Sequence, residues 1–107
     1  MEITSNDLTT KIKNGEKIVV DFWAPWCGPC KMMKPKFDTV SEQLQAENSA
    51  VQMYTVNVDE NRELSISLGI RSIPTIKGFS GGNEIYSSSG LLNEMQLKEI
   101  VDKVSNN

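Results

Sequence analysis

The chain has 107 residues, and its 14 acidic and 11 basic side chains give a net charge of −3. This length fits one domain over residues 1–107, and the mild acidity argues against nucleic-acid binding. Two cysteines and no histidine exclude a Ser-His-Asp or Cys-His nucleophile, a histidine-containing metal site and a four-cysteine zinc site. We therefore expect no metal.

The first predicted elements are two strands on either side of a helix. Residues 2–4 favour a short strand, and Thr4 or Ser5 is expected to cap a helix that ends at Gly15. Residues 17–23 are β-branched and aromatic, which is typical of a buried strand.

A long amphipathic helix is predicted next, from residue 28 to about residue 46. Apolar side chains recur there every three or four positions and form one stripe. Residues 51–58 favour another strand. Asp59 or Asn61 is then expected to cap a short helix that stops at Gly69.

The last part of the chain contains a predicted hairpin and a helix. Pro74 precedes a strand over residues 75–79, and Gly81-Gly82 indicates a tight turn into a strand over residues 83–87. Asn93 is expected to cap the final helix. The complete pattern predicts an α/β protein with helices on both sides of a mixed sheet.

Both cysteines lie in Trp26-Cys27-Gly28-Pro29-Cys30, between a predicted strand and a predicted helix. A helix N-terminus stabilises a thiolate through its free N–H groups, and Cys27 benefits most because it lies at the edge of the turn. The spacing lets the two sulfurs bond, and Gly28 and Pro29 are expected to tune the redox balance. The alternative is that the cysteines are buried structural thiols or half of a metal site.

This arrangement predicts thiol–disulfide exchange. The Cys27 thiolate is expected to attack a target disulfide and form a mixed disulfide. Cys30, expected one turn further in and more buried, then attacks the Cys27 sulfur and releases the reduced target.

Residues 21–32, which read DFWAPWCGPCKM, and residues 69–75, which read GIRSIPT, closely resemble the thioredoxin family. Further matches are Pro35, Asn57-Val58-Asp59 and Gly90, and the resemblance covers nearly the whole chain. It implies the thioredoxin fold, an α/β architecture with a central mixed four- to five-stranded sheet flanked by four helices.

The same resemblance implies a general protein-disulfide reductase that thioredoxin reductase recharges with electrons from NADPH. No cofactor would be bound, and the partners would be disulfide-containing target proteins. Trp26, Ile73, Pro74 and Gly90 are implied to form the substrate groove, with a cis Ile73–Pro74 bond. The sequence has no signal-peptide pattern and no apolar run long enough to span a membrane, so we expect a cytoplasmic monomer without membrane partners.

Asp21 lies among apolar residues, where an acid is out of place. It is either an edge-strand acid that reaches solvent or, as the resemblance implies, a partly buried carboxyl below Cys30. In the second case burial raises its pKa, and it takes the Cys30 proton through water during the second attack. Trp23 is expected to pack beside the site, and Pro35 to kink the second helix for structural reasons.

The sequence departs from the family pattern at several positions. Thr55 stands where many thioredoxins have a lysine, which leaves Asp21 with only a hydroxyl to bond. Gly78 is expected to weaken its strand, and Lys77 to extend its ammonium group to solvent. Residues 87–89 are serines, which predicts a more polar groove.

Two other functions are open at this point. The fold could serve an oxidase or isomerase in an oxidising compartment, although Gly28-Pro29 between the cysteines favours a reductant. The protein could also be a binding module that uses the groove without catalysis, and the dithiol, Asp21 and Pro74 argue against that as its only role.

Overall fold

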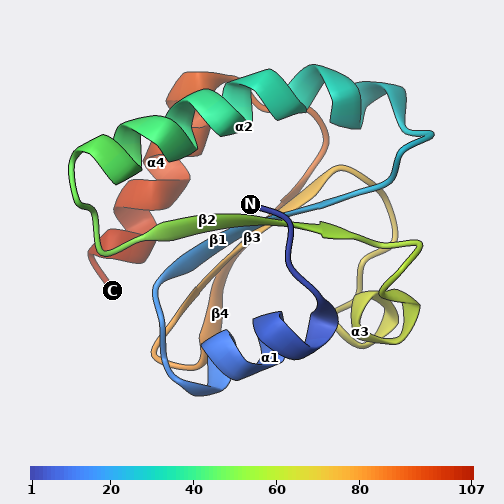
Figure 1. The fold of residues 1–107 in the computed structure, drawn as a ribbon, viewed down its shortest axis with the longest axis horizontal. Helices are drawn as coiled ribbons and strands as arrows, with labels where there is room; N and C mark the ends of the chain where they lie inside the picture. The colour runs from blue at the N-terminus through green and yellow to red at the C-terminus, as the bar shows by residue number, and fades with distance from the viewer.

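A mixed sheet of four strands runs through the centre of the molecule, with helices on both of its faces (Figure 1). The computed structural model describes residues 1–107. The strand order is β2-β1-β3-β4, and β1 pairs parallel with β2 but antiparallel with β3. The strands are β1 (Ile18–Trp23), β2 (Gln52–Asn57), β3 (Thr75–Ser80) and β4 (Asn83–Ser89).

The helices form two layers. They are α1 (Ser5–Lys13), α2 (Gly28–Ala46), α3 (Arg62–Ser67) and α4 (Glu94–Ser105). Helices α2 and α4 cover one face of the sheet, while α1 and α3 lie against the other (Figure 1). The bounds of α2 confirm the predicted range of the long helix. Its apolar stripe packs into the core between the sheet and the layer of α2 and α4. No helix in the molecule combines the length and apolar character that crossing a bilayer requires.

The alternation of side chains along β1 determines which face of the sheet Asp21 lies on. Val19 belongs to the core beneath α2 and α4, whereas Val20 and Phe22 belong to the core on the α1 side. Successive strand residues point to opposite faces, so Asp21 and Trp23 share the face of Val19. Asp21 therefore lies on the face that α2 covers.

The predicted strand at residues 2–4 is wrong in extent, because only a single parallel bridge joins Glu2 to Thr55. The Ile3 N–H donates to the Thr55 carbonyl, and the Thr55 N–H donates to the Met1 carbonyl, both over 2.9 Å. The chain cannot continue along β2, because Thr4 already caps α1 through its bond from the Asp7 N–H. The sheet thus has four full strands and one short extension.

The other predicted helix caps are confirmed in part. Asn93 caps α4 in a reciprocal pair with Gln96. Asn61 precedes α3, but its side chain makes no cap bond. Its Oδ1 instead accepts from the Ser5 N–H over 2.8 Å. This contact joins the beginnings of α1 and α3 across one face of the sheet.

The prediction that the Lys77 ammonium group reaches solvent is wrong. Lys77 is buried, and its Nζ lies 2.8 Å from Glu84 Oε1 and 3.0 Å from Ser87 Oγ. Ser87 is the direct partner of Lys77 in the β3–β4 register, and β4 continues to Ser89, two residues beyond the prediction. The neighbouring strand thus supplies the acceptors that a buried ammonium group requires.

Gly78 has a packing role that its sequence context does not show. A Cβ built at this position would come within 2.6 Å of Val104 Cγ2 and 3.6 Å of Tyr86 Cβ. The β-branched Val104 side chain has little freedom to move away. The absent side chain therefore allows α4 to pack closely on β3, so this glycine contributes to packing where we expected only a weakened strand.

We predict that Gly78→Ala lowers the free energy of unfolding by about 1–3 kcal/mol, because the added methyl group overpacks the contact with α4. Urea unfolding followed by circular dichroism measures the change. Gly28→Ala is the matched control, since nothing lies within 4 Å of its Cβ position. Adding Val104→Ala should recover part of the loss, and an unchanged midpoint for Gly78→Ala would contradict the packing argument.

Candidate active site

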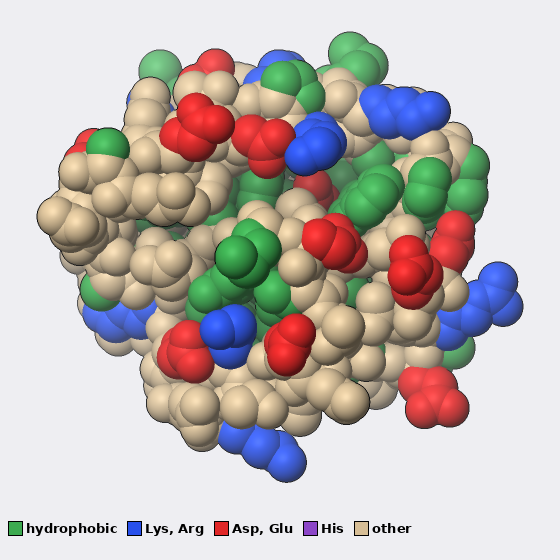
Figure 2. Space-filling view, in the orientation of Figure 1, with side chains coloured by type: hydrophobic (Ala, Val, Ile, Leu, Met, Phe, Trp, Pro, Cys, Tyr) green, Lys and Arg blue, Asp and Glu red, His purple; other side chains and the backbone are tan.

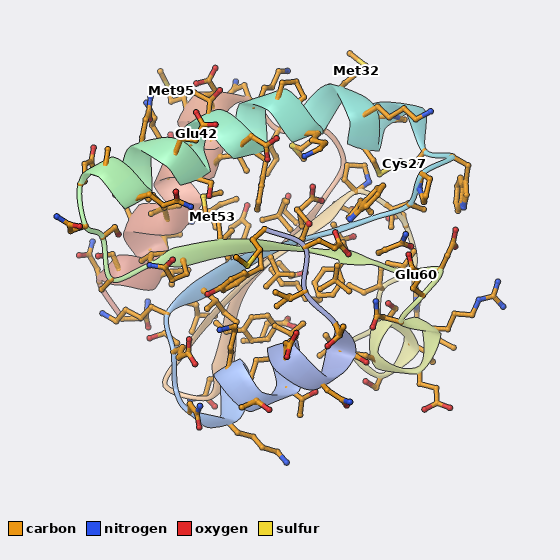
Figure 3. The ribbon with its side chains drawn as sticks, viewed as in Figure 1. Cys27, Met32, Glu42, Met53, Glu60 and Met95 are labelled. Atoms are coloured by element: carbon orange, nitrogen blue, oxygen red, sulfur yellow. A yellow bond between two sulfur atoms is a disulfide. The ribbon has the colours of Figure 1, made fainter.

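The two cysteines lie where β1 passes into α2. Cys27 is the N-cap of α2, and Pro29 occupies the first turn, which contains no acidic residue. A disulfide joins Cys27 to Cys30, with the two Cα atoms 5.3 Å apart. Figure 3 places Cys27 at the turn that leads into the helix. The Cys30 N–H, which is free at a helix N-terminus, donates to the Cys27 sulfur over 3.2 Å.

The cysteines differ in their surroundings more than in their burial. Cys27 is 5% exposed and Cys30 is 3% exposed, so the predicted contrast in burial is small. Cys27 Sγ lies 3.8 Å from the carbonyl oxygen of Ile73. Cys30 instead lines a cavity that includes Asp21 but neither Cys27 nor Ile73. Each sulfur therefore has different neighbours.

A loop distant in sequence lies against Cys27. The Ile73–Pro74 peptide bond is cis, and the Pro74 carbonyl accepts from the Gly90 N–H over 2.9 Å. Gly90 has a φ of 98°, a conformation that favours glycine. The fold thus brings Ile73, Pro74 and Gly90 to the side of the disulfide that Cys27 faces.

Trp26 is 70% exposed, and its indole N–H donates to Asp59 Oδ2 over 2.8 Å. This bond holds a large apolar side chain at the surface next to the disulfide. A hollow of about 390 Å³ begins here and is lined by Trp26, Val58, Ser65, Ile70, Arg71, Ser72 and Ile73. The serines at residues 87–89 are not among its lining residues, and Ser87 contacts Lys77 instead.

Asp21 is buried, with 3% of its surface exposed, and its Oδ1 has no hydrogen-bond partner in the protein. The pKa of this carboxyl is raised to about 7, and burial is the largest cause. The negative charges of Glu2 and Asp38 contribute to this rise, whereas the Lys34 ammonium group opposes it. The alternative of an edge-strand acid in solvent is therefore excluded.

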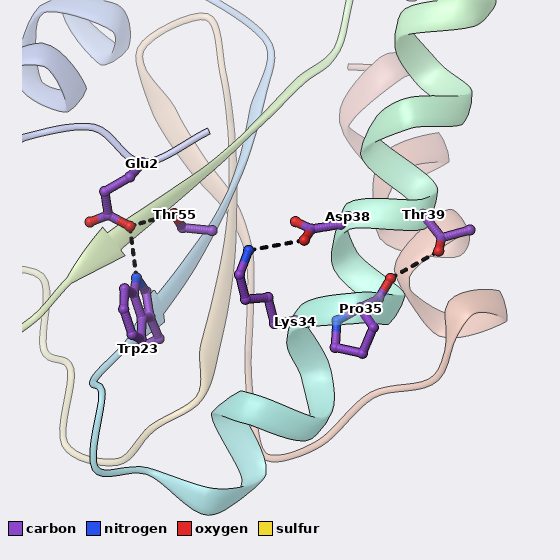
Figure 4. A network of polar contacts seen from close by, with 7 residues as sticks. All are labelled: Glu2, Trp23, Lys34, Pro35, Asp38, Thr39 and Thr55. Carbon is purple, nitrogen blue, oxygen red and sulfur yellow. Dashed lines mark hydrogen bonds and ion pairs between the residues drawn. The ribbon is translucent and has the colours of Figure 1, made fainter.

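The cavity beside Asp21 has a volume of about 250 Å³. Its lining residues are Met1, Glu2, Asp21, Trp23, Cys30, Lys31, Lys34, Asp38 and Thr55. The buried carboxyl of Asp21 and the residue Cys30 both line this cavity, together with ionisable and apolar side chains. Lys34 is already paired, because its Nζ lies 2.9 Å from Asp38 Oδ2 (Figure 4).

The expected bond between Asp21 and Thr55 is absent. The Thr55 hydroxyl donates to Glu2 Oε1, which also accepts from the Trp23 indole N–H over 2.8 Å (Figure 4). Glu2 Oε2 accepts from the Asn57 N–H over 2.8 Å. Trp23 is half-buried beside the cysteines, as expected, but its polar edge belongs to this network.

Pro35 lies inside α2, as predicted. Its carbonyl accepts a hydrogen bond from the Thr39 hydroxyl over 2.9 Å (Figure 4). Pro35 is not among the residues that line either hollow beside the disulfide. This position agrees with a structural rather than a chemical role.

Sequence reasoning missed three acidic residues around the site: Glu2, Asp38 and Asp59. Asp59 belongs to the Asn57-Val58-Asp59 match, and its position after a predicted strand was the available signal. Glu2 offered no signal, because it reaches the site only through pairing with β2.

The surface and the acidic residues point to no other kind of site. No group of three histidine, cysteine, aspartate or glutamate side chains is placed to hold a metal ion. Acidic and basic side chains alternate over the face in Figure 2, which has no extended basic patch. The disulfide and the buried carboxyl remain the groups whose geometry bears on chemistry.

Comparisons with known proteins agree with this geometry. A family model described as Thioredoxin matches residues 1–103. The thioredoxin of Rickettsia conorii is 42% identical over 86 residues, which cover 80% of this chain and 79% of that protein. Thioredoxin 1 of a Nostoc species is 38% identical over 86 residues, which cover 80% of this chain and 78% of that protein.

The same similarity holds in three dimensions. The structure of Malassezia sympodialis thioredoxin has a TM-score of 0.82 and 34% sequence identity, over 97% of this chain and 91% of that chain. The mixed sheet between two helical layers is the predicted architecture. With its Cys27–Cys30 disulfide at the start of α2, the chain belongs to the thioredoxin family of thiol–disulfide oxidoreductases.

Proposed function

We propose that this protein is a general protein-disulfide reductase in which Cys27 attacks the target and Cys30 resolves the mixed disulfide. The observation that carries this proposal is the position of Cys27 as the N-cap of α2. The N–H of Cys30 and the positive end of the helix favour a thiolate at Cys27 once the disulfide is reduced. The absence of an acid in the first turn removes an opposing charge.

The exchange proceeds in two displacements that balance in electrons and protons. The Cys27 thiolate attacks one sulfur of the target disulfide, and the other target sulfur leaves as a thiolate. Cys30 then loses its proton and attacks Cys27 Sγ, which releases the second target sulfur as a thiolate. The target disulfide has gained two electrons, and the Cys27–Cys30 pair has lost them.

Asp21 is the proposed acceptor of the Cys30 proton. Both residues line the same cavity, which has room for a bridging water. A carboxyl with a pKa of about 7 exchanges protons readily near neutral pH, because neither form is strongly favoured. The second displacement thus has a proton acceptor although the chain contains no histidine.

The proposed target groove lies on the other side of the disulfide. Trp26 supplies an exposed aromatic surface beside the hollow, and Ile73, Pro74 and Gly90 supply backbone close to Cys27. Pairing of an extended target segment with this backbone would give affinity without strict sequence preference. Protein targets with accessible disulfides are therefore the proposed substrates.

The proposed electron donor is a thioredoxin reductase that uses NADPH, and the proposed location is the cytoplasm. Both proposals rest on the family and on the Gly28-Pro29 pair between the cysteines, which favours a reductant. Gly28 and Pro29 are proposed to tune the redox balance.

We predict that Cys30→Ser accumulates a covalent mixed disulfide with an oxidised protein target, because the second displacement cannot occur. Non-reducing electrophoresis and mass spectrometry would detect the adduct. Cys27→Ser is the matched control and should form little or no adduct, since it lacks the attacking sulfur. Equal trapping by the two variants would reverse or remove the proposed roles.

We expect the protein to catalyse reduction of insulin disulfides, first with dithiothreitol and then with NADPH and a thioredoxin reductase. Turbidity of the released insulin chains measures the rate, and the Cys27→Ser/Cys30→Ser variant gives the background. Activity with dithiothreitol alone would contradict the proposed donor only. No activity in either format would favour a binding module, and a strongly oxidising equilibrium with glutathione would favour an oxidase.

We predict that Asp21→Asn slows turnover by about tenfold or more near neutral pH, with a smaller effect on target binding, because the proton acceptor is lost. Steady-state kinetics of insulin reduction over a range of pH values measure both effects. Unchanged turnover near pH 7 would remove Asp21 from the mechanism.

The same variant should be more stable than the natural protein at high pH. Because folding raises the Asp21 pKa from 3.8 to about 7, the carboxyl favours the folded state below pH 4, and this contribution is lost as the pH rises through 7. Asp21→Asn should therefore raise the free energy of unfolding by roughly 2–4 kcal/mol at pH 8 and by much less at pH 4. Urea unfolding of the oxidised protein at both pH values measures the difference.

A further inference from the structure

Three polar side chains stand in a row across one face of the sheet. Asp21 on β1 is the register partner of Thr55 on β2, and Thr55 is bridged on its other side to Glu2. Register partners on neighbouring strands point to the same face. All three residues accordingly line the cavity of about 250 Å³. The Thr55 hydroxyl therefore stands between two carboxyl groups.

A hydroxyl has a single proton to donate, and Thr55 donates it to Glu2. Trp23 lies two positions after Asp21 on β1, so its side chain is on the same face. The single N–H of the Trp23 side chain also donates to Glu2, over 2.8 Å. Two neutral side-chain donors on the same face of the sheet as Asp21 are thus bound to Glu2, while Asp21 Oδ1 has no partner.

We propose that Glu2 is a positioning residue for Asp21. By accepting from the Thr55 hydroxyl and the Trp23 indole, it leaves the buried carboxyl without a neutral hydrogen-bond donor. This inference rests on the proposed function, in which Asp21 exchanges a proton with Cys30.

Hydrogen bonds to a carboxylate favour its charged form, so withholding them favours the protonated form. The negative charge of Glu2 acts in the same direction on the pKa of Asp21. Glu2 thus raises the pH at which Asp21 loses its proton. The carboxyl can therefore exchange a proton with Cys30 near neutral pH.

The other charged groups around the cavity come from α2 and the amino terminus. Lys31, Lys34 and Asp38 line it from α2, beside the Cys30 sulfur, and Met1 lines it from the N-terminal segment. Lys34 lowers the pKa of Asp21 but is itself paired with Asp38, which raises the pKa. Lys34, the cation that lowers the pKa of Asp21, is therefore bound to another acid, as the Thr55 and Trp23 donors on the sheet are.

The experiment follows the titration of the Asp21 side-chain carboxyl by carbon-13 NMR in the oxidised full-length protein. Glu2→Ala frees both donors and should lower the Asp21 midpoint by about one pH unit. Glu2→Gln removes the charge and keeps one carbonyl oxygen that can accept from Thr55 and Trp23, while its amide nitrogen replaces the acceptor of the Asn57 N–H. Its shift should be clearly smaller, and the Asn57 amide signal reports whether the side chain stays in place. Glu60→Gln, an acid outside the cavity that bonds only to Asn57, is the matched control and should leave the midpoint unchanged.

Thr55→Val separates donor withholding from loss of charge. Alone, it should leave the Asp21 midpoint nearly unchanged, because its hydroxyl is bound to Glu2. Added to Glu2→Ala, it should raise the midpoint part of the way back toward the natural value, because it removes one of the two freed donors. The amide signals of Ile3 and Thr55 report whether the N-terminal bridge remains in each variant.

Two results would overturn the proposal: equal shifts for Glu2→Ala and Glu2→Gln, or the same effect of Thr55→Val with and without Glu2. Either would reduce Glu2 to a distant charge. The titration does not depend on turnover. If Asp21→Asn leaves insulin reduction unchanged, the catalytic role of Asp21 fails, whereas the measured control of Asp21 by Glu2 stands.

Discussion

The position of β1 inside the sheet is the constraint on which the rest of the site depends. β1 is hydrogen-bonded to β2 on one side and to β3 on the other, and helices cover both of its faces. An acid in the middle of such a strand cannot reach solvent at an edge. The carboxyl of Asp21 is therefore held away from water, and burial is the largest cause of its raised pKa.

The passage from β1 into α2 joins this carboxyl to the sulfur chemistry. The same strand that buries Asp21 leads into a turn whose last residue, Cys27, caps the helix. The first turn of α2 then returns Cys30 to the cavity that Asp21 lines. A helix terminus and a buried carboxyl, on neighbouring elements, thus lie beside the two cysteines of a chain that contains no histidine.

The two buried ionisable side chains of the sheet, Lys77 and Asp21, differ in whether their polar atoms have partners. Lys77 on β3 is bonded to Glu84 and Ser87 of the neighbouring strand, so its charge is compensated within the structure. Asp21 on β1 has a hydroxyl next to it in register, yet that hydroxyl is bound to Glu2. Buried polar groups are ordinarily satisfied, so the unpartnered Oδ1 of Asp21 in the cavity that Cys30 also lines supports the proposed role of this carboxyl.

Local sequence determined the features that depend on neighbours along the chain, whereas tertiary pairing decided those that depend on distant strands. The bounds of α2, the location of the dithiol at its start and the caps at Thr4 and Asn93 follow from short-range spacing and backbone hydrogen bonding. The partners of Thr55 do not, because Glu2 reaches Thr55 only when the N-terminal segment pairs with β2. The partners of Lys77 depend on the β3–β4 register, which shifts at an irregularity between Gly78 and Phe79 that the turn residues do not indicate. For the same reason the sequence identified Asp21 as an unusual acid, but only the folded sheet brought Glu2 to the far side of Thr55, in the same cavity.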